Sequence, residues 1–316
     1  MQAMQPAPHD SSDPLAGISV LERGWLSSNN VLLHGAPGEA GAWLIDSSHV
    51  NHAEQTVACV REALAGQPLA GIANTHLHSD HCGGNAALQR AFGLRARVPA
   101  SLLQAVRDWD EQRLSYRATG QLCERFEAGG AIAAGDAIEV GGRRWEALAA
   151  PGHDPDSLMF FDAAHGVLLS ADALWEQGFG VVFPEVAGEP GFDDVGATLD
   201  LIAALPLRIV IPGHGRPFDD IAGALARARA RLRAFQTEPA RHARHAVKVL
   251  LKYHLMEVGV QSRDDLLQWA QAAPLLQGVT RHAAPGSSVE GLCQALLDEL
   301  VAAGALKREG ERYQDA

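Results

Sequence analysis

The stretch that decides the fold of this 316-residue chain is His76-Leu77-His78-Ser79-Asp80-His81. It follows the short apolar run 69–74, and His76 and His78 are two residues apart, so on extended backbone their imidazoles point to one face. Asp80 and His81 lie further round the turn, where they can face a second ion. Imidazole and carboxylate are ligands that zinc prefers in proteins. The stretch therefore predicts a metal site at the end of a strand.

Three more ligand-type side chains each follow a short strand-like run. His153 stands in PGH after 144–149, Asp172 in SAD after 167–170, and His214 in PGHG after 207–211. Loops at the ends of strands in a rigid sheet are where functional sites are usually built. Taken alone, each of these residues is more often structural, but together with the first stretch they form the expected remainder of a two-metal site.

The order HLHSDH, PGH, SAD and PGHG resembles the motif pattern of the metallo-β-lactamase superfamily, over roughly residues 25–216. The resemblance implies a four-layer αββα sandwich of α/β (α+β) type. It also implies two divalent metal ions, with zinc expected and iron or manganese as alternatives. One ion would be held by His76, His78 and His153, the other by Asp80, His81 and His214, and Asp172 would bridge them.

The activity implied by this resemblance is that of a hydrolase (EC 3) in which a metal-bound hydroxide attacks a carbonyl or phosphoryl centre. Asp80 and Asp172 are the candidate catalytic residues, since both could orient the nucleophile. A bridging Asp without a Cys resembles the glyoxalase II, lactonase and nuclease branches. No Lys or Tyr stands out in the sequence as an acid for the leaving group, which fits a thiolate. The leading hypothesis is therefore cleavage of a thioester or related ester, as in hydroxyacylglutathione hydrolases.

Two departures from the family pattern bear on this hypothesis. After His153 the chain reads Asp154-Pro155-Asp156, where the family usually has small residues. These two carboxylates either hydrogen-bond to histidine ligands or cap a turn. Trp175 stands where some lactonases carry a Tyr, which weakens a lactonase assignment. Cys82, next to His81, is expected to be a buried and inert thiol.

The composition of the chain also indicates its cellular location and its division into domains. The four cysteines form no CxxC pair, the N-terminus has no signal-peptide pattern, and no apolar run is long enough to span a membrane. We therefore expect a cytoplasmic protein without membrane contact. Net charge is −12, yet residues 221–316 hold 13 Lys and Arg against 10 Asp and Glu. We predict a flexible tail over 1–15, a catalytic domain over 16–225, and a different unit over 226–316.

Helical periodicity dominates this last unit, over 221–236, 240–257, 263–273 and 288–303, and a hairpin-like segment follows at 304–313. Helices followed by a small hairpin predict a winged-helix-like domain. By the resemblance, its helices are expected to close over the metal site. Arg227, Arg229, Arg231 and Arg233 alternate and so spread around a helix. Arg244, Lys248 and Lys252 lie on one helical stripe, either as a solvated face or as a contact for an anionic substrate or RNA.

The substrate side of the site is predicted from the segment just past Asp172. Trp175, Phe179 and Phe183 are expected either to line an apolar substrate pocket or to pack beneath the loop. The expected partner is a small-molecule (thio)ester, with RNA as the less favoured partner, and a homo-oligomer is compatible with the sequence. The competing functions are an endoribonuclease or phosphodiesterase, a lactonase, an oxidative iron enzyme, and a non-catalytic regulatory or binding protein.

Overall fold

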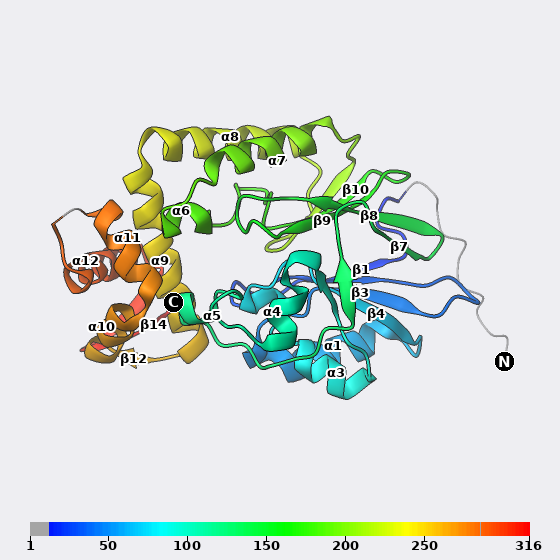
Figure 1. Ribbon diagram of the computed structural model, residues 1–316, viewed down its shortest axis with the longest axis horizontal. Coiled ribbons are helices and arrows are strands. Elements are labelled where there is room, and N and C mark those ends of the chain that lie inside the picture. Colours follow the sequence, from blue (N-terminus) through cyan, green and yellow to red (C-terminus); the bar gives the residue numbers. More distant parts are fainter. Residues whose placement is uncertain (1–12, 285) are drawn as a thin grey trace.

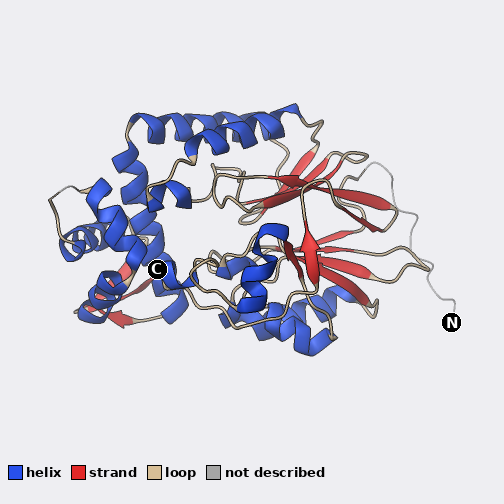
Figure 2. Cartoon of the chain, viewed as in Figure 1, coloured by secondary structure: helices blue, strands red, loops and turns tan. Residues whose placement is uncertain are grey.

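The computed structural model describes residues 13–284 and 286–316 and contains two facing sheets flanked by helices, with further helices at one end (Figures 1 and 2). The predicted four-layer αββα sandwich followed by a helical region is confirmed. Of the predicted tail, residues 1–12 lie outside the described part of the chain. No described helix has both the length and the apolar character needed to cross a membrane.

The first sheet has the strand order β1-β2-β3-β4-β5-β6. Strand β2 runs antiparallel to its neighbours β1 and β3, and β4, β5 and β6 continue the sheet parallel to β3. Helices α1 and α3 cover its outer face through apolar side chains at helical spacing, such as Val57, Val60 and Leu64 of α1. The elements of this half are β1 Ile18–Leu21, β2 Asn30–Leu33, β3 Ala42–Ile45, η1 Val50–His52, α1 Ala53–Leu64, β4 Leu69–Ala73, α2 Ser79–Cys82, α3 Asn85–Phe92, β5 Arg97–Pro99, η2 Ala100–Leu102, α4 Leu103–Asp108, α5 Tyr116–Thr119 and β6 Gly130–Ile132.

The second sheet has the order β11-β10-β9-β8-β7, in which only β10 and β11 run parallel. Helices α7 and α8 lie over its outer face (Figure 1). Between the two sheets, large apolar side chains such as Trp145, Phe160 and Ile211 form the central core. The elements are β7 Ala137–Val140, β8 Arg143–Ala149, β9 Leu158–Asp162, β10 Val167–Ala171, α6 Phe183–Ala187, α7 Phe192–Ala204, β11 Ile209–Pro212 and α8 Ile221–Thr237.

The C-terminal region has its own apolar core, made largely by α9 to α12. A small sheet of order β12-β14-β13 closes it, so the predicted helices and terminal hairpin are present. The predicted boundary at 225/226 falls inside α8, whose buried side chains pack with the second sheet. We propose Glu238, between α8 and α9, as the boundary instead. The elements are α9 Pro239–Val258, β12 Gln261–Ser262, α10 Arg263–Ala272, α11 Pro274–Ala283, α12 Val289–Ala302, β13 Leu306–Glu309 and β14 Arg312–Asp315.

A buried ion pair ties the start of the described chain to the second sheet. Arg143 Nε donates to Asp162 Oδ2 at 2.5 Å, and both side chains are buried. The other guanidinium nitrogens donate to the carbonyls of Pro14 and Ala16. Burial by itself would raise the pKa of Asp162, but the hydrogen bonds from Arg143 and His165 outweigh it and lower that pKa. The last residues of the predicted tail are thus held against the sandwich.

We predict that Asp162→Asn lowers the free energy of unfolding by about 3 kcal/mol at neutral pH, because it leaves the buried Arg143 charge without its counter-charge. Urea unfolding followed by circular dichroism measures this loss. The pKa of Asp162 is lowered in the folded state, so its contribution is present above the ordinary Asp pKa and disappears as the pH falls through the lowered value. The difference between wild type and variant should therefore shrink in acid.

The matched control is Asp200→Asn, because Asp200 pairs with Arg229 on the exposed surface. That substitution should cost less than about 1 kcal/mol. Equal losses for the two variants, or a loss at Asp162 that does not change in acid, would contradict the role assigned to the buried pair.

Candidate metal centre

The histidine-rich stretch lies between β4 and the single helical turn α2. The strand ends at Ala73, so His76 and His78 stand in the connecting loop rather than at the strand end that the sequence predicted. Their side chains nevertheless converge, with ring centroids 4.7 Å apart. Asp80 and His81 lie on α2, and both are buried. One short loop and one helical turn therefore deliver four ligand-type groups to the same place.

The other three groups arrive from the second sheet. His153 follows β8, Asp172 follows β10, and His214 follows β11. The chain must be tight at these turns: a Cβ on Gly213 would collide with Asp172 Oδ1, and one on Gly180 would collide with His153 Nδ1. Glycine is therefore required where the backbone passes next to the site.

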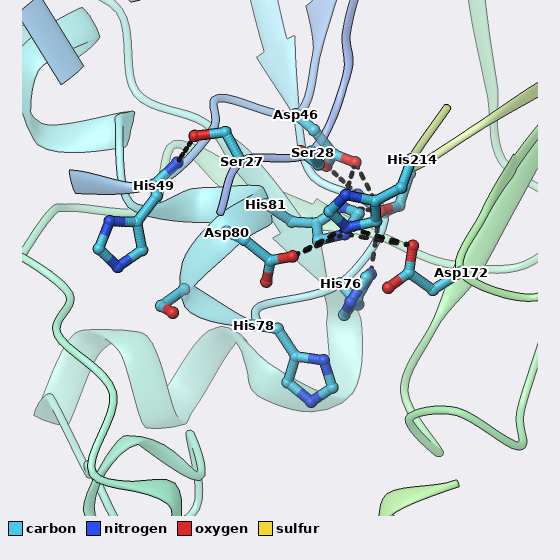
Figure 3. Close-up of polar contacts among 12 residues, drawn as sticks. Ser27, Ser28, Asp46, His49, His76, His78, Asp80, His81, Asp172 and His214 are labelled. Carbon is cyan, nitrogen blue, oxygen red and sulfur yellow. Dashed lines mark hydrogen bonds and ion pairs between the residues drawn. The ribbon is translucent and has the colours of Figure 1, made fainter. Parts of the chain in front are cut away.

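The seven side chains form two adjoining groups of potential metal ligands, His76, His78 and His153 in one and Asp80, His81, Asp172 and His214 in the other. Within each group the ligand atoms lie within 4.8 Å of one another. Asp172 faces both groups, because Oδ2 is 3.4 Å from His153 Nε2 and Oδ1 is 3.5 Å from His81 Nε2. Figure 3 shows Asp80, His81, Asp172 and His214 pointing toward one another. This is the geometry expected of a bridging carboxylate between two cations.

Some ring nitrogens inside the cluster lack a hydrogen-bond partner, and a bound metal ion would satisfy them. His76 Nε2 and His81 Nε2 are buried and have no hydrogen-bond partner. His78 Nδ1 and His153 Nε2 face each other at 2.8 Å, which only one proton can bridge. Buried polar atoms without partners are rare and costly. The nitrogen and carboxylate donors of the cluster therefore fit two divalent cations.

The opposite edges of these rings are held by hydrogen bonds from outside the cluster. His81 Nδ1 lies 2.7 Å from Asp46 Oδ2, and Asp46 also accepts from the backbone N–H and the hydroxyl of Thr75. His153 Nδ1 donates to the carbonyl of Val181 at 2.6 Å. His78 Nε2 lies 3.5 Å from Asp154 Oδ2. Such outer partners fix the orientation of ligand rings and raise their basicity.

Asp154 therefore caps a turn, since its other oxygen accepts from the backbone N–H of Asp156, and it lies within ion-pair distance of His78 without a hydrogen bond to that ring. Asp156 itself pairs with Arg113 and does not reach a histidine ligand.

The electrostatics of most of the cluster favour the protonation states that bind metal. His81 is the exception, because Asp172, Asp46 and Asp80 outweigh the effect of its burial and raise its pKa well above the usual value. Burial, together with the neighbouring imidazoles, lowers the pKa of His76 well below its usual value, and burial lowers the pKa of His78 and of His153 to about 4. These rings are therefore neutral at pH 7. Burial by itself would raise the pKa of Asp80, but His81 and His214 lower it to about 2. Neutral imidazole and ionised carboxylate are the forms that coordinate cations.

The N-terminal loop joins the two halves of the centre. The backbone N–H of Ser28 donates to the carbonyl of Asp80, and that of Asn29 donates to the carbonyl of Gly213. The Asn29 amide also donates to the carbonyls of Pro212 and Gly215. The loop therefore fixes the α2 ligands relative to His214, a role for which no sequence motif provided a signal.

A cavity of about 350 Å³ opens directly onto the cluster. His78, Asp80, His153, Asp172 and His214 form its polar floor. Its walls come from the loop after Asp172 and from α9 of the C-terminal region, which bears out the expectation that C-terminal helices close over the site. The wall residues are Trp25, Gln121, Trp175, Gln177, Phe179, Gly180, Val181, Phe183, Arg231, His245, Val249, Leu250, Lys252, Tyr253 and Met256.

Comparison with known proteins agrees with this geometry. The family model of the metallo-beta-lactamase superfamily matches residues 23–214, which contain all seven ligand-type residues. The chain belongs to the metallo-β-lactamase superfamily. A hydroxyacylglutathione hydrolase of Ectopseudomonas mendocina (strain ymp) is 31% identical over 145 residues, which cover 46% of each chain. A hydroxyacylglutathione hydrolase of Synechococcus sp. (strain JA-2-3B'a(2-13)) is 30% identical over 191 residues, which cover 60% of this chain and 64% of the relative.

The match to these curated relatives thus spans about half to two thirds of their length. A solved metallo-beta-lactamase family protein of Thermus thermophilus covers 96% of this chain and 99% of its own, with a TM-score of 0.55 and 24% identity. That similarity extends the shared fold through the C-terminal region.

Of the residues predicted to contact substrate, some line the cavity and others do not. Trp175, Phe179, Phe183 and Lys252 line the cavity. Arg244 and Lys248 do not line it, and both pair with Glu299 of α12. Arg244 and Lys248 are therefore not placed to contact a substrate at the cluster, because their side chains face Glu299, whereas Lys252 of the same stripe does line the cavity.

Several cavity residues escaped the sequence analysis. Trp25, which is 57% exposed, stacks on His214 with centroids 5.3 Å apart. Trp175 was expected in the cavity wall, but its further contact was not: Nε1 donates to Asp172 Oδ1 at 3.1 Å and so orients that carboxylate. Tyr253 reaches the cavity from α9, and its hydroxyl lies 2.7 Å from Ser79 Oγ. An aromatic residue at helical spacing looks like a core residue in sequence, so no signal distinguished Tyr253.

Cys82 has the inert character that was predicted. It is fully buried, with Sγ 3.0 Å from the Tyr116 hydroxyl. Burial raises the pKa of its thiol well above the usual value, so it stays protonated and is a poor ligand.

We predict that Asp46→Asn weakens binding of one divalent cation by about 10- to 100-fold, because His81 loses the carboxylate that holds its ring. Asn suits the left-handed backbone of Asp46, whose φ is 60°. Competition with a chromogenic zinc chelator measures the affinity. Asp110→Asn, at an exposed turn-capping carboxylate, is the control. Unchanged affinity in the Asp46 variant would contradict the role of this hydrogen bond.

Proposed function

We propose that the protein is a metal-dependent hydrolase that cleaves a thioester or related ester, in the manner of a hydroxyacylglutathione hydrolase. The observation that carries the proposal is the mainly apolar cavity whose floor is the buried His and Asp cluster. Such a cavity can take up the methylene chain of an acyl group and present its carbonyl to the cluster. The relatives named hydroxyacylglutathione hydrolase support the same reaction class.

The seven ligand-type side chains would hold two divalent cations, and we propose zinc because imidazole and carboxylate are its usual ligands. Bound there, the cations would supply a nucleophile from water at neutral pH and polarise the carbonyl of the substrate. Asp172 Oδ1 is kept in place by Trp175. Asp80 accepts a hydrogen bond from His214 Nε2 at 3.0 Å. Both carboxylates are therefore fixed where they can orient the attacking water, the catalytic role proposed for them.

The cavity walls position the substrate. Phe183 contacts the rings of both His78 and His153, with centroids 4.8 and 5.5 Å away. Trp25 and Trp175 flank His214 on the other side. These aromatic walls exclude water around the reacting carbonyl. Tyr253 is the candidate for hydrogen bonding the leaving group, since it lines the cavity and burial raises the pKa of its hydroxyl and keeps it protonated.

The structure weakens the case for RNA as the substrate. The basic stripe that suggested it is largely paired within the chain, because Arg244 and Lys248 share Glu299 and Lys252 pairs with Asp315. Phosphate binding requires Lys and Arg that can exchange counterions for the backbone of the nucleic acid.

A hydrolysis panel tests the proposal. Zinc-reconstituted protein is offered an acyl-glutathione thioester, an acyl-coenzyme A thioester, a lactone, a β-lactam, a phosphodiester and a short RNA. We expect turnover of a thioester, and a loss of roughly 100-fold or more in Asp172→Ala. Asp264→Ala, at a side chain that is 92% exposed, is the control and should keep full activity. Cleavage of RNA or the phosphodiester alone would overturn the proposal.

A further inference from the structure

Arg231 of α8 is a charged cavity residue with no carboxylate partner. Its Nη2 donates to His245 Nε2 at 2.6 Å, and no Asp or Glu of the described residues forms an ion pair with it. Burial lowers the pKa of Arg231, and burial together with the Arg231 charge lowers the pKa of His245 to about 3. His245 is therefore a neutral acceptor that does not compensate the positive charge.

Other arginines of the same helix are satisfied differently. Arg227 pairs with Asp220 and Arg229 with Asp200, both at the exposed surface. A desolvated charge costs free energy unless an opposite charge or hydrogen bonds compensate it. Arg231 is thus the position on α8 where an external anion would gain most.

The guanidinium group is also held in one place. Its central carbon lies 5.5 Å from the ring centroid of Phe179 and 5.4 Å from that of Phe235. A Cβ on Gly178 would lie 2.8 Å from Nη1, so the absence of a side chain there makes room for the group. Aromatic stacking leaves the planar edge of a guanidinium free to donate hydrogen bonds.

The same loop sets the distance from Arg231 to the metal centre. Gly178 touches Arg231, and Gly180, two residues later, touches the ring of His153. Two residues of extended chain span at most about 7 Å. Arg231 and the cluster line the same cavity, so a substrate that presents its carbonyl to the cluster can reach Arg231 with a second group on a short arm.

We propose that Arg231 recognises a carboxylate on the acyl part of the substrate, so that the preferred substrates are thioesters of short dicarboxylic acids. This inference rests on the proposed thioester hydrolysis for the reacting end of the molecule. The apolar walls, such as Phe179 and Val249, would contact the methylene arm between the carbonyl and the carboxylate. Lys252, the other cation in the wall, is already engaged by Asp315 and by the carbonyl of Ala305.

The kinetic test compares glutaryl and pentanoyl thioesters of N-acetylcysteamine, which differ by the terminal carboxylate. We expect zinc-loaded wild type to prefer the glutaryl substrate in kcat/KM. In Arg231→Met this preference should fall by roughly tenfold or more, while the pentanoyl rate persists and reports an intact metal centre. Arg231→Lys should keep part of the preference, because it keeps the charge and loses the planar fork. Arg229→Met, two residues away, is the matched control and should keep all of it.

A binding measurement separates this inference from the proposed reaction. Quenching of Trp25 and Trp175 fluorescence reports binding of glutarate and of pentanoate to the zinc-loaded protein without any turnover. Each acid has one carboxylate for the cluster, and only glutarate has a second for Arg231. Tighter binding of glutarate that is lost in Arg231→Met supports the inference even if neither thioester is hydrolysed, an outcome that would count against the proposed thioester reaction alone. Equal binding of the two acids, or a glutarate preference that survives in Arg231→Met, overturns the inference.

Discussion

The interaction on which the rest of the structure depends is the electrostatic attraction within the buried cluster of His and Asp side chains between the two sheets. Each of these groups loses hydration on burial, and only opposite charges, hydrogen bonds or bound cations can repay that loss. The two carboxylates, Asp80 and Asp172, face the histidines at 3.0–3.8 Å and keep their charge. The Nε2 atoms of His76 and His81, which have no hydrogen-bond partner, remain to be satisfied by metal ions.

Metal coordination requires accurately placed ligands, which explains why many contacts hold the surrounding loops in position. The ligands come from separated places in the chain, and a misplacement of even about one ångström would spoil coordination. Asp46 couples His81 to Thr75 at the end of β4, and Asn29 binds the turn that carries His214. Glycines at 180 and 213 let the backbone pass against His153 and Asp172, where a Cβ could not fit. The antiparallel and parallel ladders of the two sheets hold these loops at one edge of the sandwich.

The C-terminal region completes the site rather than merely following it. Glu257 of α9 contacts His49 Nε2 at 3.0 Å and accepts from the backbone N–H of Leu122, while Tyr253 contacts Ser79. These buried contacts hold α9 over the cluster, so that the cavity has walls from both parts of the chain. The wall from α8 adds the charge of Arg231, which has no carboxylate partner, to a mainly apolar surface. Chemistry at the floor and selectivity at the walls thus come from different segments.

The sequence by itself determined the family, the αββα layers and the seven ligand-type residues, because those residues must stand in short motifs just after strands. It also predicted the helices over 221–236, 240–257, 263–273 and 288–303, since their apolar periodicity is local, but it missed α11. It did not predict α7, although Phe192, Val195, Leu199 and Ile202 have helical spacing. Only the tertiary structure decided which side chains meet across long separations: that Arg244 and Lys248 pair with Glu299, that Trp25 stacks on His214, and that Arg231 enters the cavity without a carboxylate. The physical reason is that helical spacing shows which residues share a face, whereas the direction of that face depends on packing against segments far away in the chain.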